Sequence, residues 1–309
     1  MGAYMDWDQT MARPPIKAAP PANRMVFGAA AGHSSSEFYV VGYCHELDEL
    51  EIARNPAHEE FTWIYRFLNG ERQLVARLPQ RVNDLWMNPL GIVFGVGRPR
   101  GVLEITGLKC TQLALDNLRG TFSAIWGTGE EHLFACGSHD SFLLYRRSGN
   151  WSDVPLPENA GGLWSIAGAN ERDVYSVSDQ GEILHFDGRQ VVALDSPTTR
   201  WLTCVAPIPG GRICISGYDG ILLYGNQQGW RFVNTNTDEP LLNLAPYRGG
   251  VCFVTQDALW WFDGISAPQL LARQGGRWVN GLGDAVMIVD YESAWLFDGA
   301  GLVQLDTAL

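Results

Sequence analysis

Residue types that take part in catalysis and metal binding occur in this 309-residue chain, but not at the spacings that such chemistry requires. Ser138, His139 and Asp140 are the residue types of a hydrolytic triad, yet consecutive residues point in different directions and cannot form a proton relay. The stretch 28–36 (GAAAGHSSS) resembles a phosphate-binding loop, but its glycines are one residue too close and the lysine is missing. We therefore predict no catalytic residue and no cofactor. A pair of carboxylates facing each other across a cleft, as in glycoside chemistry, stays open as an alternative.

Cysteines and histidines also lack the pairing that metal sites show. The stretch 234–239 (NTNTDE) begins like a calcium loop but lacks its glycine and its final glutamate. No C-x-x-C pair and no HExxH motif is present. We predict no metal site, and we expect reduced, mostly buried thiols. The six cysteines occur singly, at Cys44, Cys110, Cys136, Cys204, Cys214 and Cys252.

Composition and charge narrow the possible partners. Apolar residues make up 46% of the chain and charged residues 18%, as in globular proteins. The formal net charge is −12 and no run of Lys or Arg occurs, so nucleic acid and anionic membranes are poor partners. The first residues combine neither a positive start nor an apolar run. We therefore expect a cytoplasmic protein.

A repeat organises most of the chain. Residues 163–188 and 124–149 share a Trp, a turn, an apolar strand, a second turn and a strand that ends on an aromatic residue. Strand-type segments repeating every ~40 residues are typical of four-stranded propeller blades. The sequence therefore predicts an all-β fold, a seven-bladed β-propeller of four-stranded antiparallel blades. The seven repeats are marked, at intervals of 35 to 41 residues, by Phe67, Ile105, Tyr145, Phe186, Tyr224, Phe262 and Phe297.

The same pattern predicts domain boundaries and local structure. Residues 1–23 form a Pro/Ala-rich tail, and residues 24–309 form a single propeller. Cysteines of the predicted second strands are expected to be packing residues, because these strands are covered by neighbouring blades on both faces. Four dipeptides predict type I′ turns between the third and fourth strands of their blades: Asn69-Gly70, Asp187-Gly188, Asp263-Gly264 and Asp298-Gly299.

The best-formed repeat, WSIAGANERDVYSVSDQGEILHFDG from Trp164 to Gly188, resembles bacterial β-propeller repeats of the BNR and YVTN-like kind. The resemblance covers roughly residues 24 to 309 and implies the propeller fold. It implies no particular function, because propellers serve as hydrolases, lyases, scaffolds and inhibitors alike.

One segment is expanded beyond the repeat. Residues 45–60, between the predicted second and third strands of blade one, carry six carboxylates against Arg54, a net charge of −5. Leu47, Leu50 and Ile52 are interspersed, so this segment could present an anionic and partly apolar arm to a basic partner. An ordinary solvated loop is the alternative. The carboxylates are Glu46, Asp48, Glu49, Glu51, Glu59 and Glu60.

A tryptophan recurs near the start of five repeats, with an arginine beside three of them. Because the innermost strand of each blade begins at one face of a propeller, we expect these indoles at or under that face, near the channel mouth. Trp and Arg are common interface hot spots, whereas packing between blades is the alternative. The residues are Trp86, Trp126, Trp164, Trp201 and Trp278, with Arg81, Arg200 and Arg277.

Together these observations favour a non-enzymatic protein-binding module that is monomeric on its own. An acidic surface without catalytic or metal motifs would suit a stoichiometric, immunity-type inhibitor of a basic toxin or effector enzyme. Two alternatives remain: a carbohydrate-active or glycan-binding propeller with a site at the channel mouth, and a scaffold with several partners.

Overall fold

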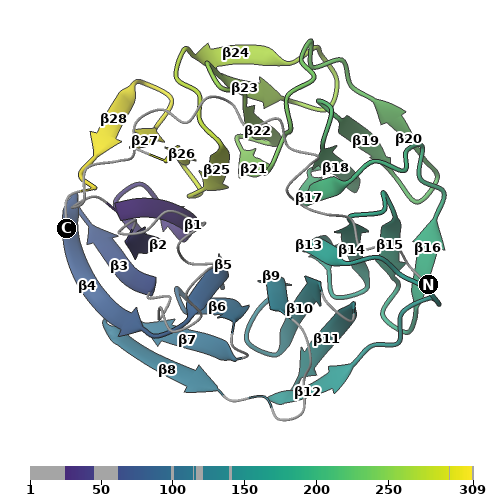
Figure 1. Cartoon of the computed structure of the whole chain (residues 1–309), viewed down its shortest axis with the longest axis horizontal. Coiled ribbons are helices and arrows are strands. Elements are labelled where there is room, and N and C mark those ends of the chain that lie inside the picture. The colour runs from purple at the N-terminus through teal and green to yellow at the C-terminus, as the bar shows by residue number, and fades with distance from the viewer. Residues whose placement is uncertain are drawn as a thin grey trace, which may run out of the picture.

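The described residues form a ring of seven blades around an axial channel (Figure 1). The structure is a computed structural model, and it describes residues 25–44, 62–98, 101–113, 115, 121–138, 141–291 and 293–307. Each blade is a four-stranded antiparallel sheet whose strands follow in chain order, with the first strand at the axis and the fourth at the rim. The predicted seven-bladed β-propeller is confirmed.

The strands of the first four blades are β1 (Met25–Ser34), β2 (Glu37–Cys44), β3 (Thr62–Leu68) and β4 (Glu71–Leu78); β5 (Arg81–Met87), β6 (Val93–Arg98), β7 (Val102–Thr106) and β8 (Lys109–Leu113); β9 (Thr121–Gly127), β10 (His132–Ser138), β11 (Phe142–Arg147) and β12 (Asn150–Asp153); β13 (Leu163–Asn170), β14 (Asp173–Ser178), β15 (Ile183–Phe186) and β16 (Val191–Leu194).

The strands of the last three blades are β17 (Leu202–Ile208), β18 (Arg212–Gly217), β19 (Leu222–Asn226) and β20 (Gly229–Phe232); β21 (Ala245–Tyr247), β22 (Gly250–Val254), β23 (Leu259–Phe262) and β24 (Gln269–Ala272); β25 (Trp278–Gly281), β26 (Val286–Val289), β27 (Ala294–Phe297) and β28 (Leu302–Leu305). Within the described ranges, no helix is long and apolar enough to span a membrane.

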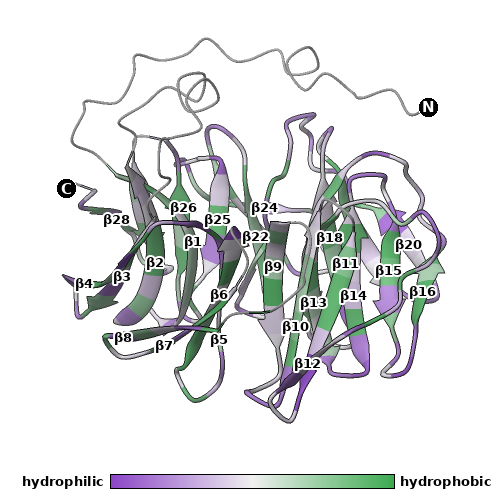
Figure 2. Cartoon of the chain, turned by 60° about the horizontal axis from the view of Figure 1, so that its bottom comes forward, coloured by the Kyte–Doolittle hydropathy of each residue, from purple (hydrophilic) through white to green (hydrophobic). Residues whose placement is uncertain are grey.

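Burial follows the position of a strand within its blade. Second strands such as β22 and β26 are buried along their whole length, because a neighbouring blade covers each of their faces. Fourth strands such as β16 and β28 keep their central residues exposed. Figure 2 shows that the strands are mostly hydrophobic and that the connections between them are more hydrophilic. As predicted, Cys136, Cys214 and Cys252 lie in second strands and are fully buried.

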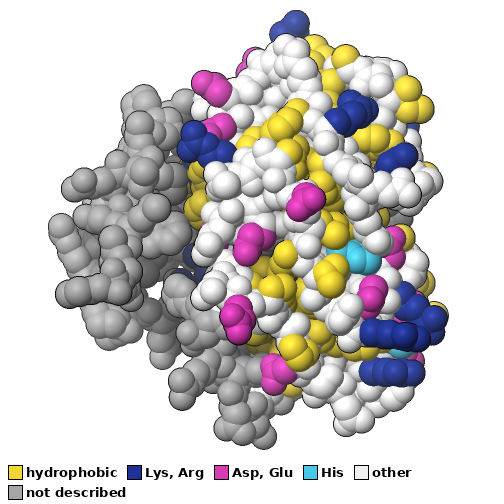
Figure 3. All heavy atoms as spheres, turned by 90° about the vertical axis from the view of Figure 1, so that its right-hand side faces the viewer, with side chains coloured by type: hydrophobic (Ala, Val, Ile, Leu, Met, Phe, Trp, Pro, Cys, Tyr) yellow, Lys and Arg dark blue, Asp and Glu magenta, His cyan; other side chains and the backbone are white. Residues whose placement is uncertain are grey.

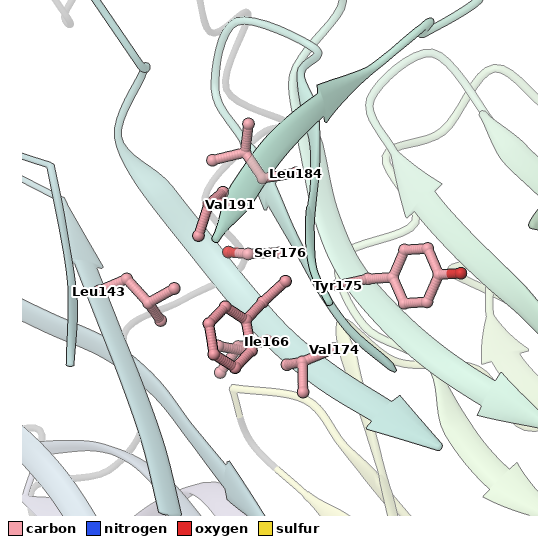
Figure 4. Close-up of a pocket in the computed structure, with 8 residues that line it drawn as sticks. Leu143, Ile166, Val174, Tyr175, Ser176, Leu184 and Val191 are labelled. Carbon is pink, nitrogen blue, oxygen red and sulfur yellow. The ribbon is translucent and has the colours of Figure 1, made fainter. Parts of the chain in front are cut away.

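Hydrophobic clusters fill the seven seams between adjacent blades. The seam between blades 3 and 4 shows how closely they pack. Leu143 of β11 meets Ile166 of β13 and Leu184 of β15 around a cavity of about 10 Å³ (Figure 4), which is at the lower limit for a single water molecule. Tyr175 points away from this cavity and packs into the next seam. The blades are therefore positioned rigidly relative to one another.

The turns between third and fourth strands correct part of the prediction. Asn69 and Gly70 have φ of 51° and 83°, as a type I′ turn requires. The other three aspartates do not have positive φ; instead, the side chains of Asp187, Asp263 and Asp298 accept hydrogen bonds from the amides two and three residues later. The type I′ prediction is wrong there, because an aspartate can close a longer turn with its own carboxylate. These bonds lower the pKa of each of the three carboxyls.

The ring closes without a shared blade. The first four and the last four strands each form a complete blade. Between them, the Met25 amide donates to the Thr307 carbonyl at 3.0 Å. The Asn280 side chain on β25 accepts from the Ala30 amide and donates to the Gly28 carbonyl, both at 3.2 Å. Closure therefore rests on side-chain packing and a few hydrogen bonds.

Candidate functional site

One face of the ring gathers most of the residues singled out in the sequence. The register pairs Met25 with Cys44 and Tyr43 with Thr62, so first strands begin, second strands end and third strands begin at this face, here called the strand-start face. The predicted acidic segment follows Cys44 and precedes Thr62. Its carboxylates lie outside the described residues: Glu46, Asp48, Glu49, Glu51, Glu59 and Glu60.

The five tryptophans divide between the two faces. Trp164 and Trp278 open β13 and β25, and Trp201 directly precedes β17, so these three lie at the strand-start face. Trp86 and Trp126 pair with Phe94 and Phe134 near the opposite ends of β5 and β9. The prediction of one common face is therefore wrong for Trp86 and Trp126. Each is followed directly by a hairpin, which places it at the end of its strand.

The two groups also pack differently. Trp86 and Trp126 are half-buried against the apolar seams of blades 2 to 5, which agrees with a packing role. Trp164 and Trp201 belong to none of the seam clusters formed by the described residues. Their ring centroids lie 4.7 Å apart, and Trp201 stacks on Tyr218 at 4.8 Å with an interplanar angle of 11°. This aromatic row is therefore separate from the apolar seam clusters of the described residues.

A second aromatic group forms around Arg277. Its guanidinium carbon lies 5.1 Å from the centre of the Trp278 ring and 4.6 Å from that of Tyr291. Burial raises the pKa of the Tyr218 phenol, and the nearby Arg277 charge lowers it, so the two groups are neighbours across the face. We refer to these six residues as the aromatic–arginine cluster: Trp164, Trp201, Tyr218, Arg277, Trp278 and Tyr291.

The other two predicted arginines lie outside this cluster or at its margin. Arg200 is exposed, and its Nε pairs with Asp219 at 2.9 Å. Arg81 is exposed at the start of β5, with its guanidinium carbon 5.1 Å from the centre of the Tyr43 ring. The strand-start face thus carries two exposed arginines, Arg81 and Arg200, and the half-buried Arg277.

Acidic groups surround the cluster. In blades 4 to 7, the described connections at the strand-start face carry nine carboxylates against three arginines, whereas those at the opposite face carry five against three. On the outer wall of blades 4 and 5, basic groups gather mainly along one margin while carboxylates lie across the middle (Figure 3). The nine carboxylates are Glu158, Asp179, Glu182, Asp195, Asp219, Asp238, Glu239, Asp257 and Asp290.

Two of these carboxylates hold the backbone in place. Asp179 accepts a hydrogen bond from the Gly162 amide at 3.0 Å, and Glu182 accepts from the Gly161 amide at 2.7 Å and from the Ser178 hydroxyl at 2.8 Å. Burial raises the pKa of Asp179, against the effect of the Gly162 bond. These carboxylates therefore position the segment that leads into Trp164.

The axial channel offers little for chemistry. All seven first strands contribute to a cavity of about 280 Å³, which is lined mainly by Ala, Gly, Pro, Val and Leu together with Trp86 and Trp126. Its lining includes His33, whose Nε2 lies 2.7 Å from the Asn88 carbonyl, and no carboxylate. The cavity is thus an apolar space rather than a pair of facing acids.

The residue types singled out in the sequence for catalysis or metal binding are spread over several blades of the described structure. Ser138 ends β10, while His139 and Asp140 lie outside the described residues. No group of three or more His, Cys, Asp or Glu side chains that could hold a metal ion was found in the described ranges. Burial raises the pKa of the Cys136 and Cys252 thiols to about 12, which disfavours the reactive thiolate.

Sequence reasoning missed Tyr218 and Tyr291. Both lie in connections between second and third strands, which emerge at the strand-start face. The signal was an aromatic residue within two positions after a buried second strand, because the connection that begins there must lie at this face whatever the blade.

No protein-family model matches the chain, so the likeness to BNR and YVTN-like repeats is not confirmed at the level of a family. A stretch of 137 residues is 28% identical to the immune protein Tsi7 of Pseudomonas aeruginosa. The match covers 41% of this chain and 44% of that protein. The chain therefore matches less than half the length of this relative.

Solved structures agree on the fold. The WD40 β-propeller domain of Doa1 superimposes with a TM-score of 0.68 over 92% of this chain and 94% of its own, at 9% identity. YCF48 from Cyanidioschyzon merolae gives 0.65 over 90% and 97%, at 13% identity. YCF48 bound to D1 peptide gives 0.63 over 97% of each chain, at 17% identity. At these identities the likeness establishes the β-propeller fold alone.

Proposed function

We propose that the protein is a non-enzymatic, cytoplasmic protein-binding propeller that acts as a stoichiometric, immunity-type inhibitor of a basic toxin or effector enzyme. The observation that carries the proposal is the row formed by Trp164, Trp201 and Tyr218. At the strand-start face Trp201 stacks on Tyr218 and contacts the tilted ring of Trp164. Neither tryptophan belongs to the seam clusters of the described residues. Trp, Tyr and Arg are the residues in which interfaces concentrate binding energy.

Charge supports a basic partner. The carboxylates around the aromatic–arginine cluster give its face a negative excess, and the acidic segment 45–60 adds a net −5 between Cys44 and Thr62. Such a field speeds the encounter with a cationic protein and disfavours acidic competitors. An inhibitor of this kind would work by covering the active site of the enzyme rather than by chemistry of its own.

The comparisons are consistent with this proposal. The partial match to the immune protein Tsi7 supports an immunity-type role. A propeller of similar shape is known in a peptide-bound form, YCF48 with the D1 peptide, which supports protein binding as a use of this architecture.

Affinity capture from a lysate of the native host tests the proposal. The bait is the intact chain, at low and at high salt, and captured proteins are identified by mass spectrometry and then mixed with pure bait to measure stoichiometry. We expect one basic protein that binds one to one, weakens at high salt and loses its activity in the complex.

A matched pair of variants locates the site. Replacing Trp164 and Trp201 together by alanine should abolish capture, whereas replacing Trp86 and Trp126, which lie at the other end of their strands, should not. Capture that depends on neither pair would place the binding site elsewhere. A failure to capture any protein, together with glycan binding that Trp86 and Trp126 control, would favour the carbohydrate alternative.

A further inference from the structure

The Nε of Arg277 lacks a hydrogen-bond acceptor among the described residues and is shielded from solvent. The guanidinium lies against Trp278 and Tyr291, so ring faces occupy space around it that water would otherwise fill. An arginine carries five N–H donors and no acceptor, and a partly desolvated charge of this kind is costly unless it is paired.

Other arginines of the protein have the oxygen acceptor that Arg277 lacks among the described residues. The Arg200 Nε has Asp219 at 2.9 Å, and Arg66 contacts Glu37 at 2.6 Å. Arg248, which also lies over a tyrosine ring, donates to the Asp298 carbonyl at 3.3 Å. The strand-start face holds nine described carboxylates in blades 4 to 7, yet no ion pair joins one of them to Arg277 within the described structure. The Nε of Arg277 therefore lacks an acceptor because of its position in the described structure, although carboxylates are present on the same face.

We propose that Arg277 receives a carboxylate from the bound protein, an Asp or Glu side chain that is seated among the rings of the aromatic–arginine cluster. This inference rests on the proposed function and specifies what the face recognises. The planar guanidinium matches a carboxylate with two parallel hydrogen bonds. Because the rings exclude water, such a pair is stronger here than at an open surface.

The charges around the cluster further restrict which partner segments can bind. A segment with several carboxylates would be repelled by the acidic groups around the cluster, and a purely basic segment would leave Arg277 opposite a like charge. The segment that fits presents one carboxylate within a basic surrounding. This combination of attraction and exclusion gives specificity as well as affinity.

A phage-displayed library of random linear peptides, selected on the intact chain, tests this inference. Parallel selections use Arg277→Gln and the matched control Arg248→Gln, whose arginine lies over a tyrosine ring at the opposite face. We expect pools rich in Lys and Arg on all three proteins, and one enriched Asp or Glu position on the wild type and on Arg248→Gln. That acidic position should disappear from the Arg277→Gln pool.

Calorimetry with one selected peptide closes a double-mutant cycle. Changing its acidic residue to the corresponding amide should weaken binding to the wild type by about tenfold or more and to Arg277→Gln by less than about threefold. Thermal unfolding confirms that Arg277→Gln is folded, since the backbone bond from the residue 277 amide to the Val289 carbonyl does not involve the side chain.

The outcomes separate the two proposals. Basic pools without an acidic position, or equal weakening on both proteins, would overturn the carboxylate inference and leave a basic partner standing. Pools without basic enrichment, or no selected binder at all, would count against both.

Discussion

At the scale of single residues, Trp164 differs from the aromatic residues of the seams. Phe134 is fully buried between blades 3 and 4, and its replacement by alanine should destabilise the protein by about 3–5 kcal/mol. Trp164 is half-buried and contacts Trp201 outside the seam clusters. We expect Trp164→Ala to cost only about 1 kcal/mol of stability but more than about 2 kcal/mol of partner binding. Urea denaturation measures the change in stability, and calorimetry measures the change in partner binding. Equal stability losses for Trp164→Ala and Phe134→Ala would assign Trp164 to the core.

A second residue makes stability depend on pH. The half-buried Asp84 on β5 accepts hydrogen bonds from the Leu85 amide and, across the seam, from the Ile125 amide of β9, both at 2.9 Å. Burial raises its pKa to about 7 from the ordinary 3.8, against the effect of both amides. Between these values the folded protein holds a proton that the unfolded chain has released. The stability that neutral Asp84 contributes to the folded protein is therefore fully present below pH 3.8 and is lost as the pH rises through 7.

Asp84→Asn isolates this effect, because asparagine keeps an acceptor and does not titrate. Unfolding free energies of both proteins should be measured from pH 4 to 8. Relative to the variant, the wild type should lose stability in this window with a slope of up to about 1.4 kcal/mol per pH unit. The aspartates with lowered pKa act in the opposite direction but are common to both proteins, so they cancel. If the unfolding free energies of the two proteins ran parallel over this pH range, Asp84 would have the same pKa in the folded and unfolded states.

At the scale of elements, the sequence predicted strands and blades well and the placement of side chains within them less well. Apolar runs and turn residues recur locally in each repeat, so the second strands and the insertion before Thr62 were identifiable. Trp86 and Trp126 were assigned to the wrong face because a recurring tryptophan was taken as the start of a repeat. The turn that follows each of their strands, beginning at Asn88 and at Thr128, carried the missing information.

Seam hydrogen bonds between first strands lead to a prediction at this scale. Asn280 of β25 is buried and bonds the Ala30 amide and the Gly28 carbonyl of β1, where no shared blade closes the ring. Asn280→Ala should therefore destabilise the protein by about 1–3 kcal/mol, since it leaves these backbone groups unpaired. Asn150→Ala, at the exposed start of β12 in blade 3, should change stability by less than about 0.5 kcal/mol. Chemical denaturation compares them; a negligible effect of Asn280→Ala would mean that packing alone closes the ring.

At the scale of the whole molecule, the candidate site depends on closure of the ring. Tyr218 in blade 5 and Arg277 in blade 7 are far apart in the sequence, and only the circular arrangement brings them within electrostatic range. No local pattern could have predicted that pair. The half-burial of Trp164 and Trp201 likewise depends on which side chains neighbouring blades supply. The fold was therefore predictable from repeats, whereas the cluster required three-dimensional structure.

Charge acts over the whole molecule, and its role is tested by reversing it in the acidic segment 45–60 and, separately, on the face opposite the strand-start face. Changing Glu46, Asp48, Glu49 and Glu51 to lysine should slow association with a basic partner by about tenfold or more at low salt and flatten its salt dependence. We expect thermal stability to change little, because the substitutions replace none of the described seam residues. The control reverses four carboxylates at turns of the opposite face and should leave the salt slope steep: Glu71, Glu130, Glu131 and Glu171. Stopped-flow association rates over a range of ionic strength compare the two sets. Equal slowing by both would mean that net charge, not the acidic segment 45–60, steers the partner.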